Sequence, residues 1–293
     1  MYTCEECGYK VDFWLLARLV HHQSIIKCRK KGCRANLTIR TCPECVDCNM
    51  PMEMFKYPFI RLGLVGLKGS GKTDFISTAL SELGCNNSTQ TLYQNLGKLK
   101  LEIQGENFSG FWKIADSRRT YGLGVYEFSD EKNSGKYANI FNAILFTIDF
   151  ATDDERAVVA TLKELTKLIV GSDKRGDSII NLPPLAVIIT KFDKIIYEPE
   201  LRSEFGIHSI AMMPATQIRD GKLNLSEVRE VSNEVKHFLE DNGWENLVKI
   251  VQANFTKHMF FVTSVNVSQI TSGDTMPHRV LDPLLWSLQS RVK

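Results

Sequence analysis

Apolar runs of strand length alternate with helical patterns from Phe59 to the end of the chain. The runs at Phe59–Val65, Ala143–Asp149 and Leu185–Thr190 are apolar almost throughout, which is typical of strands buried on both faces of a sheet. A helical pattern follows the first run at Asp74–Leu83. Strands that alternate with helices favour βαβ units and a mostly parallel sheet. The sequence therefore predicts an α/β domain.

The remaining elements are shorter or less regular in pattern. Strands are expected at Leu99–Ile103, at His258–Ser264, and at Leu123–Phe128 or from slightly before it. Helices are expected at Asp153–Val170, with two aspartates in the first turn, and at Ser226–Glu240, Trp244–Phe255 and Val280–Ser290. The order of these elements extends the alternation to the end of the chain.

Composition narrows the class of protein. The chain has 293 residues, 43% of them hydrophobic, which is enough for a sizeable core, and its formal net charge is +2. The longest apolar runs contain Arg18 and Asp149 and fall short of the roughly 18 apolar residues of a membrane span. The first residues carry cysteines and glutamates in place of a basic signal region. We expect a cytoplasmic protein with no membrane partner.

The cysteines are concentrated at one end of the chain, since only Cys85 lies outside the first 50 residues. In a reducing compartment such a cluster indicates metal binding more often than disulfides. The composition thus divides the chain into a Cys-rich zinc ribbon at residues 1–50 and an α/β domain at residues 57–293. The candidate zinc ligands are Cys4, Cys7, Cys28, Cys33, Cys42, Cys45 and Cys48.

These cysteines allow more than one pairing. Cys4 and Cys7 with Cys28 and Cys33 would form one tetrahedral thiolate site, and the last three cysteines would need an eighth ligand, His21 or His22, for a second. The alternative pairs Cys28 and Cys33 with Cys42 and Cys45. Because nothing indicates a vacant coordination position, we expect a structural role. We expect one to two zinc ions per chain, which metal analysis of the purified protein would test.

Basic residues also occur in the Cys-rich segment. Such a patch is able to meet phosphate backbones, but zinc ribbons also serve as protein-docking modules. We expect a protein partner in preference to nucleic acid. The residues are Lys27, Arg29, Lys30, Lys31, Arg34 and Arg40.

A phosphate-binding loop is predicted at Gly66–Thr73, where Gly66-Leu67-Lys68-Gly69-Ser70-Gly71-Lys72-Thr73 matches G-x-x-x-x-G-K-[ST] in full. Glycines let backbone N–H groups turn inward around an anion, and the N-terminus of the following helix adds partial positive charge. Lys72 is able to reach the β- and γ-phosphates of a nucleotide, and the Thr73 hydroxyl is able to ligate Mg²⁺. Lys68, Ser70 and Asp74 are further candidate contacts. A strand before the loop and a helix after it support a triphosphate site.

The base is predicted from Thr190-Lys191-Phe192-Asp193, which follows a buried strand. Guanine presents N1–H and an amino group side by side, and one carboxylate accepts from both. Adenine has a bare acceptor at that position, so Asp193 would stay unpaired, which is costly in a buried site. Lys191 is expected to lie over the base and ribose. The carboxyl end of a strand is also where open α/β sheets bind ligands.

With these motifs the chain resembles the Ras-like (TRAFAC-type) P-loop GTPases from Phe59 to Lys293. Phe261-Val262-Thr263-Ser264-Val265 is similar to the last base-contacting segment of this family, and the resemblance implies that Ser264 and Val265 lie near the guanine. Ala143–Asp149 is similar to the buried central strand of the family. The resemblance implies a Ras-like three-layer sandwich that binds GTP or GDP with Mg²⁺. More distantly, the Cys-rich segment and the Arg279–Trp286 stretch resemble bacterial double-GTPase families of conflict systems.

The chain departs from the Ras-like pattern after the strand at Leu123–Phe128. The family carries D-x-x-G there, its Asp holding Mg²⁺ through water and its Gly sensing the γ-phosphate. Here either Glu127 replaces the Asp, with Asp130 in place of the Gly and Glu131 in place of a water-positioning Gln, or Asp130 is the carboxylate on the metal side. Neither alignment supplies the glycine. We expect slow or partner-dependent hydrolysis.

The sequence does not assign the remaining switch roles to single residues. Thr89 and Thr91 are equal candidates for a hydroxyl on Mg²⁺, and Arg118 and Arg119 for an arginine finger, although an exposed turn is the more usual setting of such a pair. Three alternatives to a GTP-hydrolysing switch follow: a nucleotide-bound scaffold without catalysis, an ATP-dependent P-loop enzyme, and a zinc-dependent nucleic-acid binder.

Overall fold

The computed structural model describes residues 59–85, 94–104, 107–115, 120–128, 141–171, 182–205, 208–215, 218–219, 222–268 and 275–290, together with four short strands near the N-terminus. Those four strands form two antiparallel pairs. The first pair is β1 (Tyr2–Thr3) with β2 (Lys10–Val11), and the second is β3 (Ile25–Lys27) with β4 (Asn36–Thr38).

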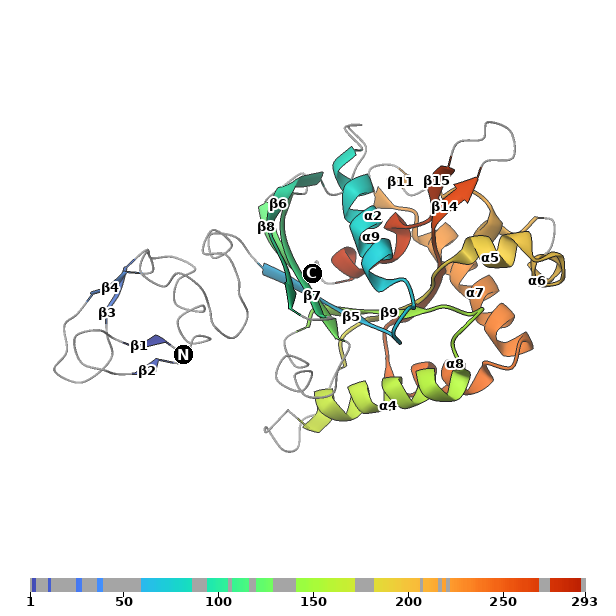
Figure 1. The fold of residues 1–293 in the computed structure, drawn as a ribbon, viewed down its shortest axis with the longest axis horizontal. Coiled ribbons are helices and arrows are strands. Elements are labelled where there is room, and N and C mark those ends of the chain that lie inside the picture. Colours follow the sequence, from blue (N-terminus) through green and yellow to red (C-terminus); the bar gives the residue numbers. More distant parts are fainter. Residues whose placement is uncertain are drawn as a thin grey trace.

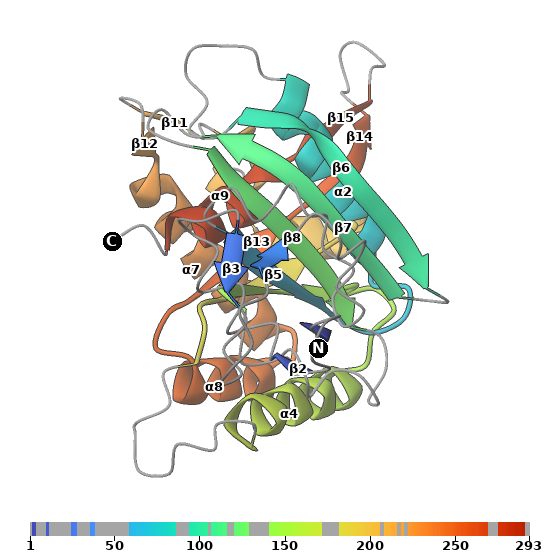
Figure 2. The same cartoon turned by 90° about the vertical axis from the view of Figure 1, so that its left-hand side faces the viewer.

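A seven-stranded sheet forms the centre of the α/β domain, with strand order β13-β10-β9-β5-β8-β7-β6 (Figure 1). Five neighbouring strands are parallel: β13 (His258–Val262), β10 (Leu185–Ile189), β9 (Ala143–Ile148), β5 (Phe59–Val65) and β8 (Thr120–Phe128). An antiparallel extension of β7 (Asn107–Ala115) and β6 (Gln94–Gln104) continues the sheet beyond β8 (Figure 2). The predicted α/β class with a mostly parallel sheet is confirmed.

Helices cover both faces of the sheet. On one face lie α4 (Glu155–Gly171), α7 (Leu225–Asp241) and α8 (Glu245–Asn254), and on the other lie α2 (Lys72–Cys85) and α9 (Leu281–Gln289). A hydrophobic core lies on each face of the sheet. Alternate residues of β9 pack into one core and then the other, because successive side chains of a strand point to opposite faces. Ile144 and Phe146 join the α4 side, whereas Ala143 and Leu145 join the α2 side.

The shorter elements lie between β10 and α7 and after β13. They are α5 (Phe192–Tyr197), α6 (Pro199–Glu204), the 3-10 turn η4 (Ile210–Met212) and two small antiparallel pairs. The pairs are β11 (Ile218–Arg219) with β12 (Lys222–Leu223), and β14 (Ser264–Ser268) with β15 (Thr275–His278).

The structure corrects several predicted boundaries. The strand expected at His258–Ser264 ends at Val262, and Ser264 instead begins β14. The N–H group of Thr263 makes the last bond to β10, to the Ile189 carbonyl, and the Thr263 carbonyl accepts from the backbone of Phe192, which lies beyond β10. The strand expected near Leu123 begins at Thr120, and the one expected at Leu99–Ile103 extends over Gln94–Gln104. Strand β7, which pairs with both, was not predicted.

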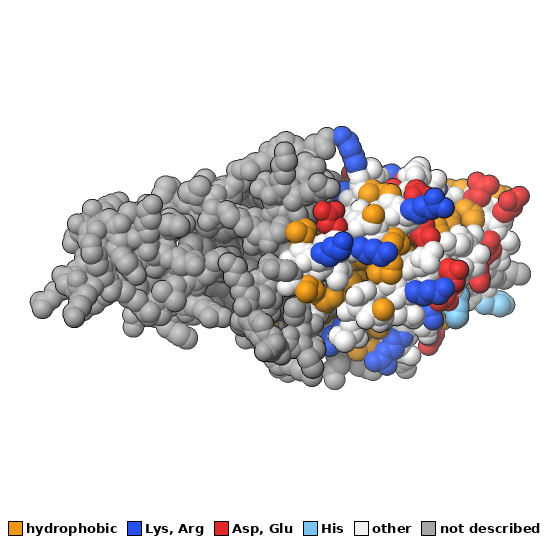
Figure 3. Space-filling view, turned by 90° about the horizontal axis from the view of Figure 1, so that it is seen from below, with side chains coloured by type: hydrophobic (Ala, Val, Ile, Leu, Met, Phe, Trp, Pro, Cys, Tyr) orange, Lys and Arg blue, Asp and Glu red, His pale blue; other side chains and the backbone are white. Residues whose placement is uncertain are grey.

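The helical face formed by α4 and α8 carries mixed charges. Figure 3 views the molecule from that side and shows basic, acidic and apolar side chains interspersed over its described part. Glu155, in the first turn of α4, joins the two helices by accepting the backbone N–H groups of Asn246 and Leu247 at the start of α8. None of the helices in the described ranges is long and apolar enough to cross a membrane.

Candidate functional site

The predicted site residues follow the carboxyl ends of the parallel strands. Chain order reverses at β5, whose two neighbours, β8 and β9, both come later in the chain. The loop after such a strand lies at a topological switch point, where open α/β sheets bind ligands. The loops after β5, β9, β10 and β13 are therefore brought to one edge of the sheet, together with Glu127 near the end of β8.

The loop after β5 requires glycine at several positions. Gly66, Gly69 and Gly71 have φ values of 154°, 86° and 74°, a region that side chains disfavour. A Cβ on Gly66 would lie 2.4 Å from Thr147 Oγ1 and 2.7 Å from Ser70 Oγ. The loop ends at α2, a helix of 14 residues with Thr73 and Asp74 exposed in its first turn. The helix N-terminus favours an anion here.

Lys72 lies in this loop with its charge already engaged. Its Nζ donates to the carbonyls of Gly66 at 3.0 Å and Leu67 at 2.8 Å, and it pairs with Glu127 Oε1 at 3.5 Å. The side chains of Lys72 and Glu127 are only 5% and 7% exposed. The structure thus brings together two of the predicted residues, from β8 and from the loop. An anion in the loop would find an ammonium group within it.

Two hydroxyl groups join the loop to neighbouring strands. Thr147 Oγ1, on β9, donates to the carbonyl of Val65 at 3.2 Å and lies 2.8 Å from Ser70 Oγ. Thr190 Oγ1, directly after β10, donates to the carbonyl of Ser70 at 2.6 Å, with the Ile148 carbonyl at 3.0 Å. The first residue of the Thr190–Asp193 motif therefore contacts the loop after β5 directly.

Lys191 crosses from the motif to the loop and to a buried carboxylate. Its backbone is left-handed, with φ 53°, and its Nζ donates to the Gly69 carbonyl and to Asp149 Oδ2, each at 2.7 Å. Lys194 donates to the same Asp149 oxygen at 3.1 Å. Asp149 is only 1% exposed. The Gly69 carbonyl and the Asp149 carboxylate together fix the direction of the Lys191 side chain.

Asp149 is a site residue that the sequence analysis did not single out. Burial raises the pKa of the Asp149 carboxyl, but hydrogen bonds from Lys191, Thr152 and Lys194 and the charge of Lys191 outweigh it, so the pKa lies below its ordinary value. Asp149 is therefore an anion at neutral pH. The signal available in the sequence was a carboxylate directly after a wholly apolar strand, at the end where ligands bind.

Asp193 and Ser264 meet across two loops. The Ser264 hydroxyl donates to Asp193 Oδ1. The backbone supports this meeting, because Thr263 N donates to the Ile189 carbonyl at 2.8 Å and Phe192 N donates to the Thr263 carbonyl at 3.1 Å. Ser264 is buried, whereas Asp193 and Val265 are half-buried. The structure thus brings together the two segments expected to contact the base.

Other predicted residues lie outside the described residues. They are Asp130 and Glu131, Thr89 and Thr91, Arg118 and Arg119, and the seven candidate zinc cysteines. Their assigned roles stay predictions. Within the described ranges, no group of three or more His, Cys, Asp or Glu side chains is arranged to hold a metal ion.

Comparison with known proteins leaves the family open. No protein-family profile matches the chain, and no curated protein is significantly similar to it in sequence.

Proposed function

We propose that the chain is a guanine-nucleotide-binding switch protein with a Ras-like P-loop sandwich. One observation carries the proposal: Thr190 and Lys191 hydrogen-bond to the loop Gly66–Thr73 while Asp193, in the same motif, is held by Ser264. Residues suited to phosphates and residues suited to a base thus belong to one connected structure. A single nucleotide, with phosphates in the loop and its base at Asp193, would use both.

The phosphate end supports a triphosphate with Mg²⁺. Lys72 would exchange its loop carbonyls for phosphate oxygens, which are stronger acceptors because they are charged. Thr73 and Glu127 offer oxygen donors of the kind that Mg²⁺ prefers, and Glu127 lies within reach of the loop through its pairing with Lys72. These two residues would hold the ion, which would neutralise charge on the phosphates.

The base end supports guanine over adenine. Asp193 Oδ1 accepts from Ser264, and a carboxylate has enough lone pairs to accept two further N–H groups from guanine. With adenine the half-buried carboxylate would face an acceptor and gain no hydrogen bond from the base. Lys191, fixed by Asp149 and Gly69, would supply the aliphatic stem that covers one face of the base.

We further propose that hydrolysis is slow or depends on a partner protein. Glu127 places a carboxylate 3.5 Å from the ammonium group that would serve the phosphates. A carboxylate in that position competes with phosphate for Lys72 unless Mg²⁺ screens it. The same pairing favours a second candidate function, a nucleotide-bound scaffold that does not hydrolyse GTP. A turnover assay distinguishes the two, since a scaffold keeps bound GTP intact.

Two measurements test the proposal: the affinity of the wild-type protein for GDP and ADP, and the base preference of a variant with a changed Asp193. Wild-type protein should bind GDP at least 100-fold more tightly than ADP, since such sites discriminate by up to about 10⁴–10⁵. Xanthine carries a carbonyl in place of the guanine amino group. Asp193→Asn should therefore exchange the preference from GDP to XDP, because an amide donates to that carbonyl and still accepts from N1–H.

A matched control is Asp241→Asn, which alters an exposed aspartate at the end of α7. It should keep the wild-type preference. Equal affinity of the wild-type protein for GDP and ADP would contradict the assignment of the base site.

A further inference from the structure

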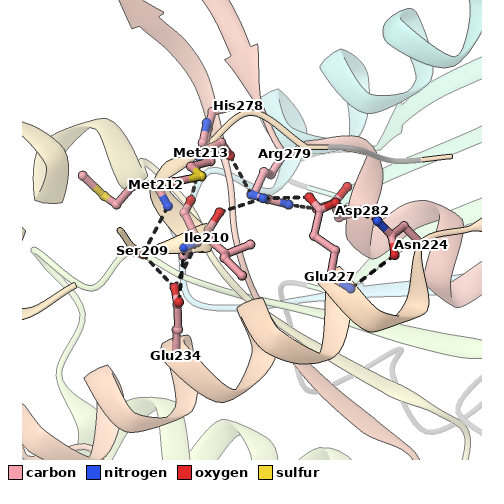
Figure 4. Close-up of polar contacts among 11 residues, drawn as sticks. Ser209, Ile210, Met212, Met213, Asn224, Glu227, Glu234, His278, Arg279 and Asp282 are labelled. Carbon is pink, nitrogen blue, oxygen red and sulfur yellow. Dashed lines mark hydrogen bonds and ion pairs between the residues drawn. The ribbon is translucent and has the colours of Figure 1, made fainter. Parts of the chain in front are cut away.

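A buried polar cluster lies where the β14–β15 hairpin meets α7 and α9. We call it the Arg279 cluster and show it in Figure 4. It connects the segment around η4 with side chains from α7, from the start of α9 and from β15. Its members are Ser209, Ile210, Ala211, Met212, Met213, Asn224, Glu227, Glu234, His278, Arg279 and Asp282.

Arg279 is at the centre of this cluster. Its side chain is 1% exposed, and its guanidinium donates to the carbonyls of Met213 at 3.0 Å and Ile210 at 2.7 Å. It also pairs with Asp282 at 2.7 Å and Glu227 at 2.9 Å. Its backbone is left-handed, with φ 50°. A non-glycine residue keeps that conformation only where its surroundings fix it, so the position of Arg279 is strongly determined.

Glu234, on α7, holds the η4 segment from the opposite side. Its carboxylate accepts from Ser209 Oγ at 2.7 Å and from the backbone N–H groups of Ile210 at 3.1 Å and Ala211 at 3.0 Å. Figure 4 shows these contacts below η4 and those of Arg279 above it. The η4 backbone is therefore fixed on both sides.

His278 joins this fixed backbone to the proposed base site. Its Nε2 lies 2.8 Å from the Ala211 carbonyl, which only accepts, so Nε2 carries the proton. The imidazole stacks on the ring of Phe192, with centroids 5.7 Å apart and planes at 21°. Phe205 meets Phe192 edge-on at 5.2 Å. Phe192 is fully buried and directly precedes Asp193.

His278 also lies opposite Ser264 in the neighbouring strand. Ser264 is the first residue of β14, and its partner in the β14–β15 pair is His278. His278 thus adjoins both members of the Asp193–Ser264 pair: it stacks on Phe192, which precedes Asp193, and it pairs with Ser264 across the two strands.

We propose that His278, anchored by the Arg279 cluster, is a positioning residue that sets the base selectivity of the site. This inference rests on the proposed guanine-nucleotide binding. The imidazole ring fixes Phe192, which places the Asp193 carboxylate where both of its oxygens meet the guanine edge. Without the ring, the carboxylate keeps one contact with the base and loses the alignment needed for the second.

The test compares affinities for GDP and IDP, since hypoxanthine lacks only the 2-amino group of guanine. His278→Gln keeps an N–H for the Ala211 carbonyl but has no ring, and His278→Phe keeps a ring over Phe192. We expect His278→Gln to lower the preference for GDP over IDP by about tenfold, the effect of one poorly formed hydrogen bond to a charged group. We expect His278→Phe to keep it within about threefold of wild type.

His237→Gln is the matched control, because His237 lies on α7 with a side chain 68% exposed. It should have the wild-type preference. Loss of overall affinity with an unchanged GDP-to-IDP ratio in His278→Gln would overturn the proposal, since a purely structural role predicts that result. A His278→Phe variant that loses the preference would also overturn it.

Failure of the proposed function gives a different result. Wild-type protein that binds GDP and ADP equally overturns guanine recognition and, with it, the role of His278. Wild-type protein that prefers GDP over ADP, combined with an unchanged ratio in His278→Gln, overturns only the role of His278.

Discussion

The sheet edge and the Arg279 cluster both place cations against backbone carbonyls and carboxylates, but they differ in the solvent exposure around the cation and in the number of its protein partners. At the sheet edge, Lys72 and Lys191 each donate to loop carbonyls and pair with one carboxylate, and Lys68 and Gly69 beside them are exposed. In the cluster, Arg279 is 1% exposed, and its guanidinium contacts two carbonyls and two carboxylates.

The difference separates a site for a ligand from a device that fixes the fold. Lysine is a point charge on a flexible stem, so it is able to exchange one acceptor for another as a ligand arrives. Arginine presents a rigid fork, and with its partners supplied by the protein an exchange would leave buried groups unpaired. We therefore expect changes at the sheet edge to alter binding, and changes at Arg279 and its carboxylate partners to alter stability.

The largest expected effect is on the stability of the cluster. Arg279→Met leaves Asp282 and Glu227 without their cation, and breaking a buried pair in this way costs about 3–5 kcal/mol. Arg279→Lys keeps the charge but loses the fork, so its loss should be intermediate. Denaturant unfolding measures both. Arg229→Met, at an exposed position on α7, should change the free energy of unfolding by less than about 0.5 kcal/mol.

An Arg279→Met variant as stable as Arg229→Met would remove the contrast between the two regions. It would show that water replaces the guanidinium at little cost.

The next effect is on binding at the sheet edge. Lys72→Met should weaken GDP binding roughly 100-fold, because one charge-assisted contact to phosphate is worth up to about 3 kcal/mol. Its unfolding free energy should fall less than that of Arg279→Met, since Lys72 Nζ lies 3.5 Å from Glu127 whereas the Arg279 guanidinium lies within 2.9 Å of two carboxylates. Isothermal titration measures the affinity. Lys163→Met, on the exposed side of α4, is the control, and equal GDP affinities of the two variants would contradict the role of the loop.

The smallest of these effects is a pH dependence inside the cluster. Burial raises the pKa of Asp282 to about 6, with Arg279 opposing. The folded chain thus holds this proton more tightly than the unfolded chain does. The resulting stabilisation is present at low pH and is lost as pH rises through about 6. Asp282→Asn cannot titrate, so the stability of wild type relative to this variant should fall by roughly 2 kcal/mol from about pH 4.5 to about pH 7.5.

Urea unfolding at the two pH values measures this difference. A difference that stays constant or grows with pH would show that Arg279 and the surrounding groups compensate fully for the burial of the carboxylate.

The sequence predicted the parallel half of the fold well because its signals are local. Strands β9 and β10 are continuous apolar runs buried on both faces, which is the pattern of central parallel strands. Strand β7 was missed for the opposite reason. Gly110 and Lys113 interrupt its apolar pattern, and it becomes a strand through its neighbours, as in the pairing of Trp112 with Leu123.

The candidate site followed the same rule. Gly66–Thr73 and Thr190–Asp193 were found because each is a contiguous pattern with its own chemistry. Asp149 depends on two lysines 42 and 45 residues later, and no local pattern indicates that contact. Arg279 begins the Arg279–Trp286 stretch, whose sequence showed only a distant resemblance to known families. The residues next to it in the sequence do not indicate that its backbone is left-handed or that its partners lie around η4.

The loop Gly66–Thr73 is short in sequence, but it is not a portable module. Two of the hydroxyls that hold it belong to Thr147 and Thr190, which lie 77 and 120 residues from their partner Ser70. Transplanting the motif alone would leave both contacts behind, and a chain made from its N-terminus holds the loop unsupported until those strands have been added. The loop therefore depends on the whole sheet edge, and a chain that keeps the motif but lacks the hydroxyl of Thr147 or Thr190 would lose part of the support of the loop.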